Sequence, residues 1–306
     1  MALTGVLRPG YCQLRVLDLD AAIKHYVDLV GLELVSREAD GRAYLKATDE
    51  FDRHSVILRP ADHAGVDVFG FKVDSEASLA EFERRIVEYG LAVDSVPAGE
   101  QPGVGRRIGF TLFSGHRIEL FSHIERSARG PETHNPYIWR QTPHGAAAIR
   151  MDHALFYGPD IEKNLDFFQK VLDFKLTEAI ETPDGLLAIW LSCSTKAHDI
   201  AFVRHPEPGK FHHLAFFLED WNAIGHAADL MVRNNTAIDI GPTRHGVTRG
   251  QTIYFFDPSG NRNETYAGGY TFYPDDPLRT WDTTELGRGI FYYERALNDR
   301  FLTVLT

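Results

Sequence analysis

The chain repeats itself, and this internal repetition limits its fold more than any other feature. The segment HYVDLVGLEL from His25 resembles FFQKVLDFKL, which begins 142 residues later at Phe167. SGHRIEL from Ser114 resembles SGNRNET, which begins 145 residues later at Ser259. A third pair, GFKV and AFFL, shows the same spacing of 145. Three matches in one order at a nearly constant spacing predict a tandem duplication.

Each half divides once more into two similar units. Apolar stripes with helical spacing occur at 23–30, 79–89, 161–172 and 221–231. Asp18 or Asp20 can cap the first helix, and Gly31 and Gly90 can end the first two. A strand-like run precedes each stripe, and about three follow it. The sequence therefore predicts an α+β fold of four βαβββ modules in two tandem domains.

A stretch with three prolines and little periodicity, Ser127 to His144, separates the halves and is typical of a linker. We therefore expect an N-terminal domain over residues 1–126 and a C-terminal domain over residues 145–306. Residues after about Tyr270 have no counterpart in the first half, so they should form an added C-terminal segment.

Composition excludes several kinds of partner. A formal net charge of −11 and the lack of a basic run argue against nucleic acid or an anionic membrane surface. The sequence has no run of about 18 apolar residues, so no membrane span is expected. Cys12 and Cys193 are too few for a disulfide framework or a thiolate metal cluster, and they suit a reducing cytoplasm. A small molecule is the expected partner.

Two histidines of the second half stand opposite different residues in the first. At the spacings above, His153 is the counterpart of Tyr11, and His213 is the counterpart of Val68. A residue needed only for folding should stay similar in both halves, so both histidines are candidates for function. A histidine on an apolar strand face is otherwise more often a core residue whose hydrogen bonds are satisfied.

Glu264, the counterpart of Glu119, completes a set of metal donors. Two imidazoles and one carboxylate on separate strands are the ligands of non-haem Fe(II) oxygenases, and Mn(II) and Zn(II) accept the same donors. We expect this metal site in the C-terminal domain and none in the N-terminal domain. On its own, Glu264 near a turn could equally be a solvated charge.

Two further histidines lie close to these candidates and stay ambiguous. Strand alternation puts His213 on one face with Ala215 and puts His212 on the opposite face with Leu214. His205 is the second ambiguous residue, because it is also near a proposed ligand in the sequence.

The segment HGVTRGQTIYFFDPSGNRNE, from His245 to Glu264, resembles the signature of the extradiol ring-cleavage dioxygenases. In that pattern a histidine precedes an apolar–tyrosine pair, an acidic-Pro-x-Gly turn and the metal-binding glutamate. The similarity covers nearly the whole chain, including STKAHD, GPTRHG and DRFLTVLT. The chain is similar to the catechol 2,3-dioxygenases, or metapyrocatechases, of the vicinal oxygen chelate superfamily. The βαβββ modules of that superfamily agree with the pattern above.

The resemblance implies cleavage of catechol and small alkylcatechols by O2 to 2-hydroxymuconic semialdehydes. It implies Fe(II), with Mn(II) possible, and a homotetramer. By position it assigns the metal ligands to His153, His213 and Glu264, the acid–base role to His198, and hydrogen bonds to the substrate to His245 and Tyr254. The expected pocket wall consists of Trp190, Val247, Ile290 and Phe301.

Two alternatives belong to the same fold. One is a metal-dependent glyoxalase or isomerase, which would favour a fourth protein ligand and would not need His198, His245 and Tyr254. The other is a non-enzymatic binder of small molecules, which should have lost the metal donors in both halves. Structural roles also stay open for His198, as a turn residue, and for Tyr254, as an interior strand tyrosine.

Overall fold

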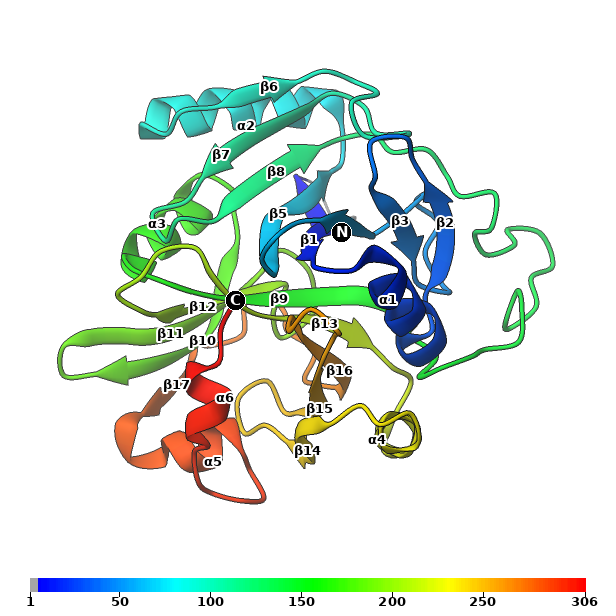
Figure 1. Ribbon diagram of the computed structural model, residues 1–306. Helices are drawn as coiled ribbons and strands as arrows, with labels where there is room; N and C mark the ends of the chain where they lie inside the picture. The colour runs from blue at the N-terminus through cyan, green and yellow to red at the C-terminus, as the bar shows by residue number, and fades with distance from the viewer. Residues whose placement is uncertain (1–4) are drawn as a thin grey trace.

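The computed structural model describes residues 5–306, so residues 1–4 of the predicted N-terminal domain lie outside the described part. Two βαβββ modules make up the first half (Figure 1). Module 1 comprises β1 (Val6–Val16), α1 (Leu19–Lys24), the π-helix η1 (His25–Val30), β2 (Glu33–Arg37), β3 (Ala43–Lys46) and β4 (Val56–Pro60). Module 2 comprises β5 (Gly65–Val73), α2 (Glu76–Tyr89), β6 (Asp94–Val96), β7 (Arg107–Thr111) and β8 (Arg117–Phe121).

The second half repeats this order of elements. Module 3 comprises β9 (Arg150–Gly158), α3 (Ile161–Lys170), β10 (Lys175–Thr182), β11 (Gly185–Ser192) and β12 (Ile200–Arg204). Module 4 comprises β13 (Lys210–Phe217), α4 (Trp221–Arg233), β14 (Ile238–Arg244), β15 (Gly250–Phe256) and β16 (Arg262–Gly268). The added C-terminal segment contains β17 (Arg279–Asp282), η2 (Thr283–Glu285), α5 (Leu286–Ile290) and α6 (Asp299–Thr303). The predicted α+β fold of four βαβββ modules is confirmed.

The helix ends follow from the capping residues seen in the sequence. The carboxylate of Asp18 accepts a hydrogen bond of 3.0 Å from the backbone N–H of Ala21, so Asp18 rather than Asp20 is the N-cap of α1. Gly31 ends η1 with a φ of 90°, which favours glycine. A Cβ atom at Gly31 would also lie 2.3 Å from the carbonyl oxygen of His144, so the linker can approach only a glycine here.

The strands form two sheets with the same internal order. The first sheet runs β2-β3-β4-β1-β5-β8-β7-β6, and its central strands β1 and β5 are antiparallel. The second sheet runs β14-β15-β16-β13-β9-β12-β11-β10-β17, and its central strands β9 and β13 are antiparallel. The additional strand β17 pairs in parallel with β10. None of the helices within residues 5–306 has the length and apolarity that a membrane crossing requires.

Strand register confirms the predicted duplication residue by residue. In each sheet the first strand of one module pairs with the first strand of the next, and that strand pairs with the last strand of its own module. The aligned rows are Tyr11–Gly70–Glu119 in the first sheet and His153–Ala215–Glu264 in the second. The counterparts expected from the sequence spacings therefore occupy equivalent places in space.

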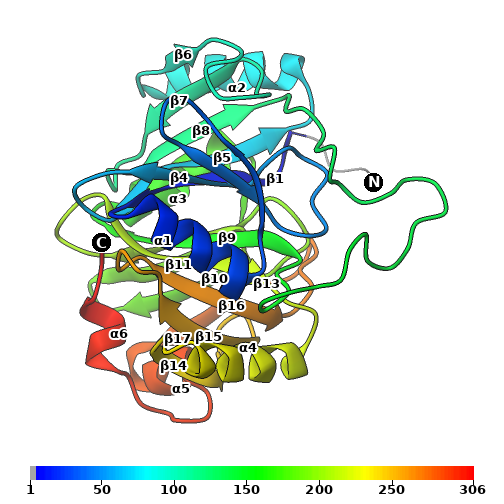
Figure 2. The same ribbon diagram turned by 45° about the vertical axis from the view of Figure 1, so that its right-hand side comes forward.

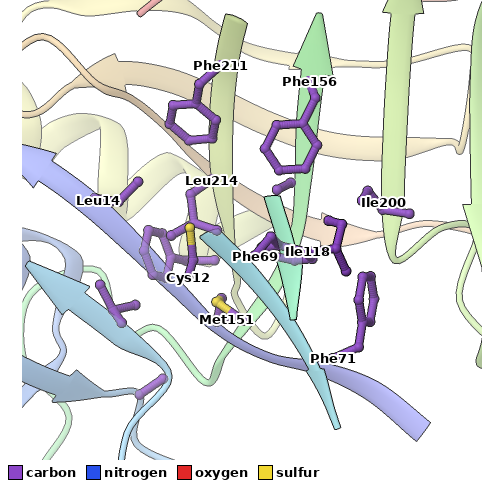
Figure 3. Packing of buried hydrophobic residues seen from close by; sticks show 14 of the residues in the cluster. Cys12, Leu14, Phe69, Phe71, Ile118, Met151, Phe156, Ile200, Phe211 and Leu214 are labelled. Atoms are coloured by element: carbon purple, nitrogen blue, oxygen red, sulfur yellow. The ribbon is translucent and has the colours of Figure 1, made fainter. Parts of the chain in front are cut away.

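One hydrophobic core joins the two halves (Figure 3). The rings of Phe69 and Phe156 pack edge to face at 5.9 Å, and those of Phe71 and Phe174 do so at 5.3 Å. Such aromatic pairs contribute beyond the area they bury. The connecting segment 127–149 contains no helix or strand and loops outward beside the first half (Figure 2). The domain boundaries at residues 126 and 145 stay a prediction.

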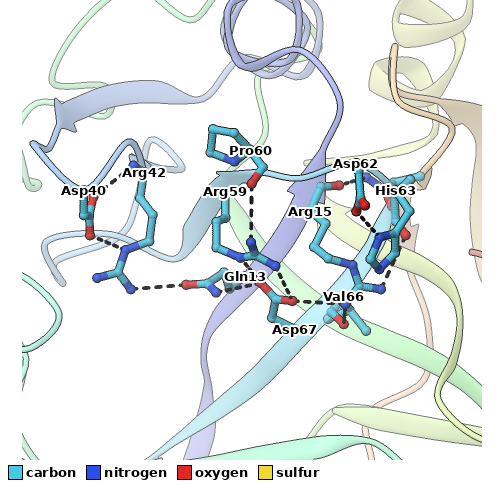
Figure 4. A network of polar contacts seen from close by, with 12 residues as sticks. Gln13, Arg15, Asp40, Arg42, Arg59, Pro60, Asp62, His63, Val66 and Asp67 are labelled. Carbon is cyan, nitrogen blue, oxygen red and sulfur yellow. Dashed lines mark hydrogen bonds and ion pairs between the residues drawn. The ribbon is translucent and has the colours of Figure 1, made fainter.

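A polar network around Asp67 lies on the face of the first sheet that points away from the shared core (Figure 4). The carboxylate of Asp67 accepts hydrogen bonds from Arg59 at 2.6 Å, Gln13 at 2.8 Å and Arg15 at 3.0 Å. Burial alone would raise the pKa of Asp67, but these hydrogen bonds hold it below its ordinary value. The carboxylate is therefore ionised and keeps both arginines on this face of the sheet.

Candidate metal centre and active site

Three neighbouring strands of the second sheet bring the predicted ligands together. His153 lies on β9, His213 on β13 and Glu264 on β16, and β13 pairs with both of the other strands. One ligand atom from each residue lies within 4.8 Å of the others, and all three side chains are buried. Among residues 5–306, this is the one group of three donors found close enough to hold a metal ion.

The donor atoms converge on one point. Nε2 of His153 is 3.0 Å from Oε2 of Glu264, and Nε2 of His213 is 3.1 Å from the same oxygen. Nε2 of His213 and Oε1 of Glu264 are buried without a hydrogen-bond partner. Leaving such atoms unpaired costs on the order of 1–3 kcal/mol each, and more where charge is involved. A divalent cation between the three side chains would satisfy them, so the residues fit a metal ion.

The protonation states also fit a cation. Burial lowers the pKa of His213 to about 4, so this imidazole is neutral and keeps a lone pair. Burial alone would lower the pKa of His153, but hydrogen bonds to Asp152 and Glu264 raise it above its ordinary value. Burial opposes ionisation of Glu264, yet both histidines hold its pKa well below its ordinary value. A proton on His153 therefore competes with a cation for the same carboxylate.

A second carboxylate orients His153 from behind. Asp152 Oδ2 accepts a hydrogen bond of 2.9 Å from Nδ1 of His153, which leaves Nε2 for a metal. Nζ of Lys196 lies 3.2 Å from Asp152 Oδ1 and 3.0 Å from Asp199 Oδ1. Burial would raise the pKa of Asp152, but Lys196 and His153 hold it far below its ordinary value. Lys196 thus ties the loop that carries His198 to the carboxylate behind a proposed ligand.

His198 lies directly beside His153. The two ring centroids are 4.0 Å apart, and Nδ1 of His198 is buried without a hydrogen-bond partner. Burial and the neighbouring His153 lower the pKa of His198 well below its ordinary value. The ring is therefore neutral, with one N–H donor and one lone pair. An unpaired nitrogen in a buried site favours a functional role over a turn role.

His245 and Tyr254 form a hydrogen-bonded pair at the edge of the cluster. Nδ1 of His245 donates to the carbonyl oxygen of Ile290, so its Nε2 is left as an acceptor. The hydroxyl of Tyr254 donates to this nitrogen at 2.8 Å. Burial raises the pKa of Tyr254 well above its ordinary value, so the phenol keeps its proton. The pair can therefore pass a proton in one direction, from the hydroxyl of Tyr254 to Nε2 of His245.

All ten side chains predicted for the site line one cavity of about 390 Å³ of space free of protein atoms, part of it open to solvent. The sequence did not identify three further lining residues, namely Leu155, Thr248 and Tyr266. Leu155 and Tyr266 each lie two positions beyond a proposed ligand on the same strand, so strand alternation could have indicated them. Thr248 follows Val247 in a loop, where no periodicity applies.

The two ambiguous histidines have different positions. His205 lies on a surface turn, where its Nδ1 accepts a hydrogen bond of 3.1 Å from the backbone of Glu207. His212 lies directly behind the cluster, with its Nδ1 at 2.6 Å from Nδ1 of His213. The alternation that placed His212 with Leu214 is wrong, because a β-bulge in β13 between Phe211 and His213 inserts His212 as an extra residue.

In the first half an arginine stands where the second half has room for a cation. Glu119 accepts hydrogen bonds from Nε of Arg107 at 2.9 Å, from Nε of Arg117 at 3.3 Å and from the hydroxyl of Tyr11. The ring of Phe121 stacks on Tyr11 with centroids 5.0 Å apart. The two guanidinium groups neutralise the carboxylate, and the aromatic rings fill the adjoining space. The duplicated glutamate is thus retained with a structural partner.

Comparisons with known proteins agree with this geometry. A family model described as the glyoxalase/bleomycin resistance protein/dioxygenase superfamily matches residues 150–265. A second, described as the catechol 2,3-dioxygenase-like N-terminal domain, matches residues 66–125. The three proposed metal ligands, His153, His213 and Glu264, fall within the first match.

Three individual proteins show how far the similarity extends. A metapyrocatechase of Pseudomonas sp. strain CF600 is 50% identical over 304 residues, which cover 99% of each chain. A manganese-dependent 2,3-dihydroxybiphenyl 1,2-dioxygenase of Geobacillus genomosp. 3 is 29% identical, over 93% of this chain and 92% of that one. The crystal structure of the 2,3-dioxygenase LapB from Pseudomonas sp. KL28 matches with a TM-score of 0.90 at 47% identity, over 92% of this chain and 99% of that one. The chain therefore belongs to the metapyrocatechase family of extradiol dioxygenases.

Proposed function

We propose that the chain is a metal-dependent catechol 2,3-dioxygenase. It opens the ring of catechol and of small alkylcatechols beside the two hydroxyls, and the products are 2-hydroxymuconic semialdehydes. The convergence of His153, His213 and Glu264 on one wall of a cavity is the observation that carries this proposal. Full-length similarity to a metapyrocatechase supports the choice of reaction.

His153, His213 and Glu264 would hold one divalent ion. Two neutral imidazoles and one carboxylate leave positions free for a chelating substrate and for O2. A bound ion of this kind supplies a Lewis acid and a path for electrons from catechol to O2. We propose Fe(II), the ion for which this donor set is typical, and keep Mn(II) as the alternative because one relative is named manganese-dependent.

Tyr254 and His245 handle the substrate hydroxyls. Nε2 of His245 is an acceptor because its Nδ1–H donates a hydrogen bond to the carbonyl oxygen of Ile290. A proton leaving a catechol hydroxyl can therefore pass through the hydroxyl of Tyr254 to Nε2 of His245. Positioned general bases of this kind contribute about 10²–10⁴ in rate.

His198 has a separate role, which is to interact with O2 rather than with the substrate hydroxyls. Its unpaired Nδ1 and its place beside His153 allow the neutral imidazole to donate a hydrogen bond to oxygen. A proton released by a catechol hydroxyl can bind the free lone pair of His198, and the imidazolium formed in this way can return that proton to oxygen.

The remaining wall selects an apolar ring. Trp190, Val247, Ile290 and Phe301 line the cavity and place carbon against the bound substrate. Trp190 and Val247 are fully packed among other apolar side chains, so they restrict the size of ring substituents. We therefore propose catechol and small alkylcatechols rather than charged or two-ring catechols.

Two alternatives from the same fold receive less support. A metal-dependent glyoxalase or isomerase would favour a fourth protein ligand, and the group found among residues 5–306 has three. A non-enzymatic binder would need no buried donors, and this cavity has them. The homotetramer implied by the family stays a prediction, which light scattering of the purified protein tests.

The direct experiment uses protein purified without oxygen and loaded with either Fe(II) or Mn(II). After addition of catechol and air, we expect a yellow semialdehyde, with more turnover from the Fe(II) form. If catechol is not consumed by protein with metal bound, the proposed function is wrong. If only the Mn(II) form is active, the choice of ion is wrong and the reaction stands.

A variant separates the role of His198 from that of a ligand. His198→Ala should keep metal and catechol binding and should slow turnover with O2 by about 10²–10⁴. Loss of the metal from this variant would instead make His198 a ligand.

A further inference from the structure

The β-bulge in β13 has a counterpart in β5, but the inserted residues of the two bulges have different surroundings. In the first sheet a register shift in β5 inserts Asp67 between Val66 and Val68 opposite β1. In the second sheet the equivalent shift in β13 inserts His212 between Phe211 and His213 opposite β9. Bulges re-aim a side chain, and they recur next to active sites. Asp67 points into the arginine network of Figure 4, whereas His212 points to a proposed metal ligand.

His212 is packed from several sides and is 1% exposed. Its ring stacks on Tyr157 with centroids 5.2 Å apart and an interplanar angle of 9°, and the ring of Phe301 meets it edge to face at 4.6 Å. Both ring nitrogens have partners. Nε2 lies 2.8 Å from the carbonyl oxygen of Phe301, and Nδ1 lies 2.6 Å from Nδ1 of His213.

These two contacts determine where the protons lie. A carbonyl oxygen can only accept, so the proton of His212 is on Nε2. In a neutral ring Nδ1 is then a lone pair, and it accepts from Nδ1–H of His213. Nε2 of His213 is left without a proton and faces Glu264 at 3.1 Å. A backbone carbonyl thus specifies the tautomer of a proposed ligand through one intervening imidazole.

The carbonyl at the end of this chain is itself held in place. Phe301 lies in α6, and the backbone of Thr306 just beyond α6 exchanges two hydrogen bonds with Phe211, at 2.8 and 3.0 Å. Arg262, two residues before Glu264 on β16, donates to the carbonyl oxygen of Val304 at 2.9 Å. The segment around α6 is therefore fixed to two of the strands that carry proposed ligands.

We propose that His212 is a positioning residue that holds His213 in the metal-binding tautomer by relaying the Phe301 carbonyl to Nδ1 of His213. The inference rests on the proposed metal site. Partners behind a metal-binding histidine typically change metal affinity about 10–100-fold when they are removed. Without the acceptor, His213 can rotate or place its proton on Nε2, and both changes oppose metal binding.

Two substitutions of His212 distinguish hydrogen bonding from packing. His212→Phe keeps a ring against Tyr157 but removes the acceptor. His212→Asn loses the ring but keeps an oxygen near the position of Nδ1. Competition with a chelator for Mn(II), and for Fe(II) without oxygen, gives the metal affinity of each purified full-length variant.

We expect about 10–100-fold weaker metal binding in His212→Phe and affinity close to wild type in His212→Asn. His212→Gln, whose amide can still donate to Phe301 but does not place an acceptor at Nδ1, should behave like His212→Phe and serves if that variant does not fold. Asp67→Asn, at the equivalent bulge, should bind metal as wild type does.

The opposite order, with His212→Phe near wild type or His212→Asn the weaker binder, would overturn the proposal and leave a packing role. If the wild-type chain itself bound no metal, the proposed function would fail instead, so the two failures are distinguishable.

Discussion

Burial of His116 at the junction of the two halves should make stability depend on pH. His116 lies in the turn before β8 and is 3% exposed. Its Nε2 donates to the carbonyl oxygen of Lys210 on β13 at 2.9 Å, and its Nδ1 accepts from Ser114 at 2.9 Å. Burial outweighs the hydrogen bond to Lys210 and lowers the pKa of His116 to about 4, from 6.5 for a free histidine.

The sign follows from proton binding. Between pH 6.5 and 4 the unfolded chain binds a proton at His116 and the folded chain does not, so stability is complete above pH 6.5 and falls as the solution becomes more acidic. The two pKa values correspond to a loss of about 2 kcal/mol between about pH 8 and pH 5. His116→Gln can still donate to Lys210 but does not titrate, so it should lose this part of the pH dependence.

Denaturant unfolding of metal-free protein at the two pH values measures the difference. The exposed His123→Gln is the matched control and should keep the wild-type pH dependence. Other buried histidines, such as His54, contribute equally to wild type and variant and cancel in the comparison. If His116→Gln lost as much stability on acidification as wild type, the argument from burial would be refuted.

Three other substitutions test the site and the equivalent place in the first half. Tyr254→Phe removes the donor to His245 and should lower turnover about 10²–10⁴-fold while metal content stays unchanged, as metal analysis and oxygen uptake will show. Lys196→Met leaves Asp152 and Asp199 without their shared cation, so the free energy of unfolding should fall by about 3 kcal/mol and metal binding should weaken. Arg107→Met removes the closer of the two guanidinium groups that pair with the buried Glu119, and leaves Arg117 at 3.3 Å, so it should lower the free energy of unfolding by about 1–3 kcal/mol without changing metal affinity.

The fold could be predicted from the sequence because the residues that repeat between the halves are those that pack in the core or end the helices. Apolar stripes and capping residues such as Asp18 and Gly90 mark the helices. The spacing between the halves then gives the counterparts, and the paired strands reproduce it at His153 and Glu264. Local propensity, periodicity and duplication all favour the same structure, and such agreement is what makes a fold predictable.

Features that depend on the partner strand could not be predicted. The bulge at His212 changes which way one side chain points, and nothing in the local pattern of apolar residues marks it. Arg107 reaches Glu119 only after two strands have paired. The carbonyl of Phe301 likewise approaches β13 through a segment that has no counterpart in the first half. Contacts of this kind decide that Glu119 meets two arginines and that Glu264 faces His153 and His213.

Metal content of two matched variants tests most directly whether His153, His213 and Glu264 hold the metal. Glu264→Gln and Glu119→Gln change the same residue at equivalent places in the two sheets. After loading with Fe(II) or Mn(II) and removal of free ion, we expect about one ion per chain in wild type and in Glu119→Gln, and almost none in Glu264→Gln. Retention of the ion by Glu264→Gln, or its loss from Glu119→Gln alone, would contradict the proposed site.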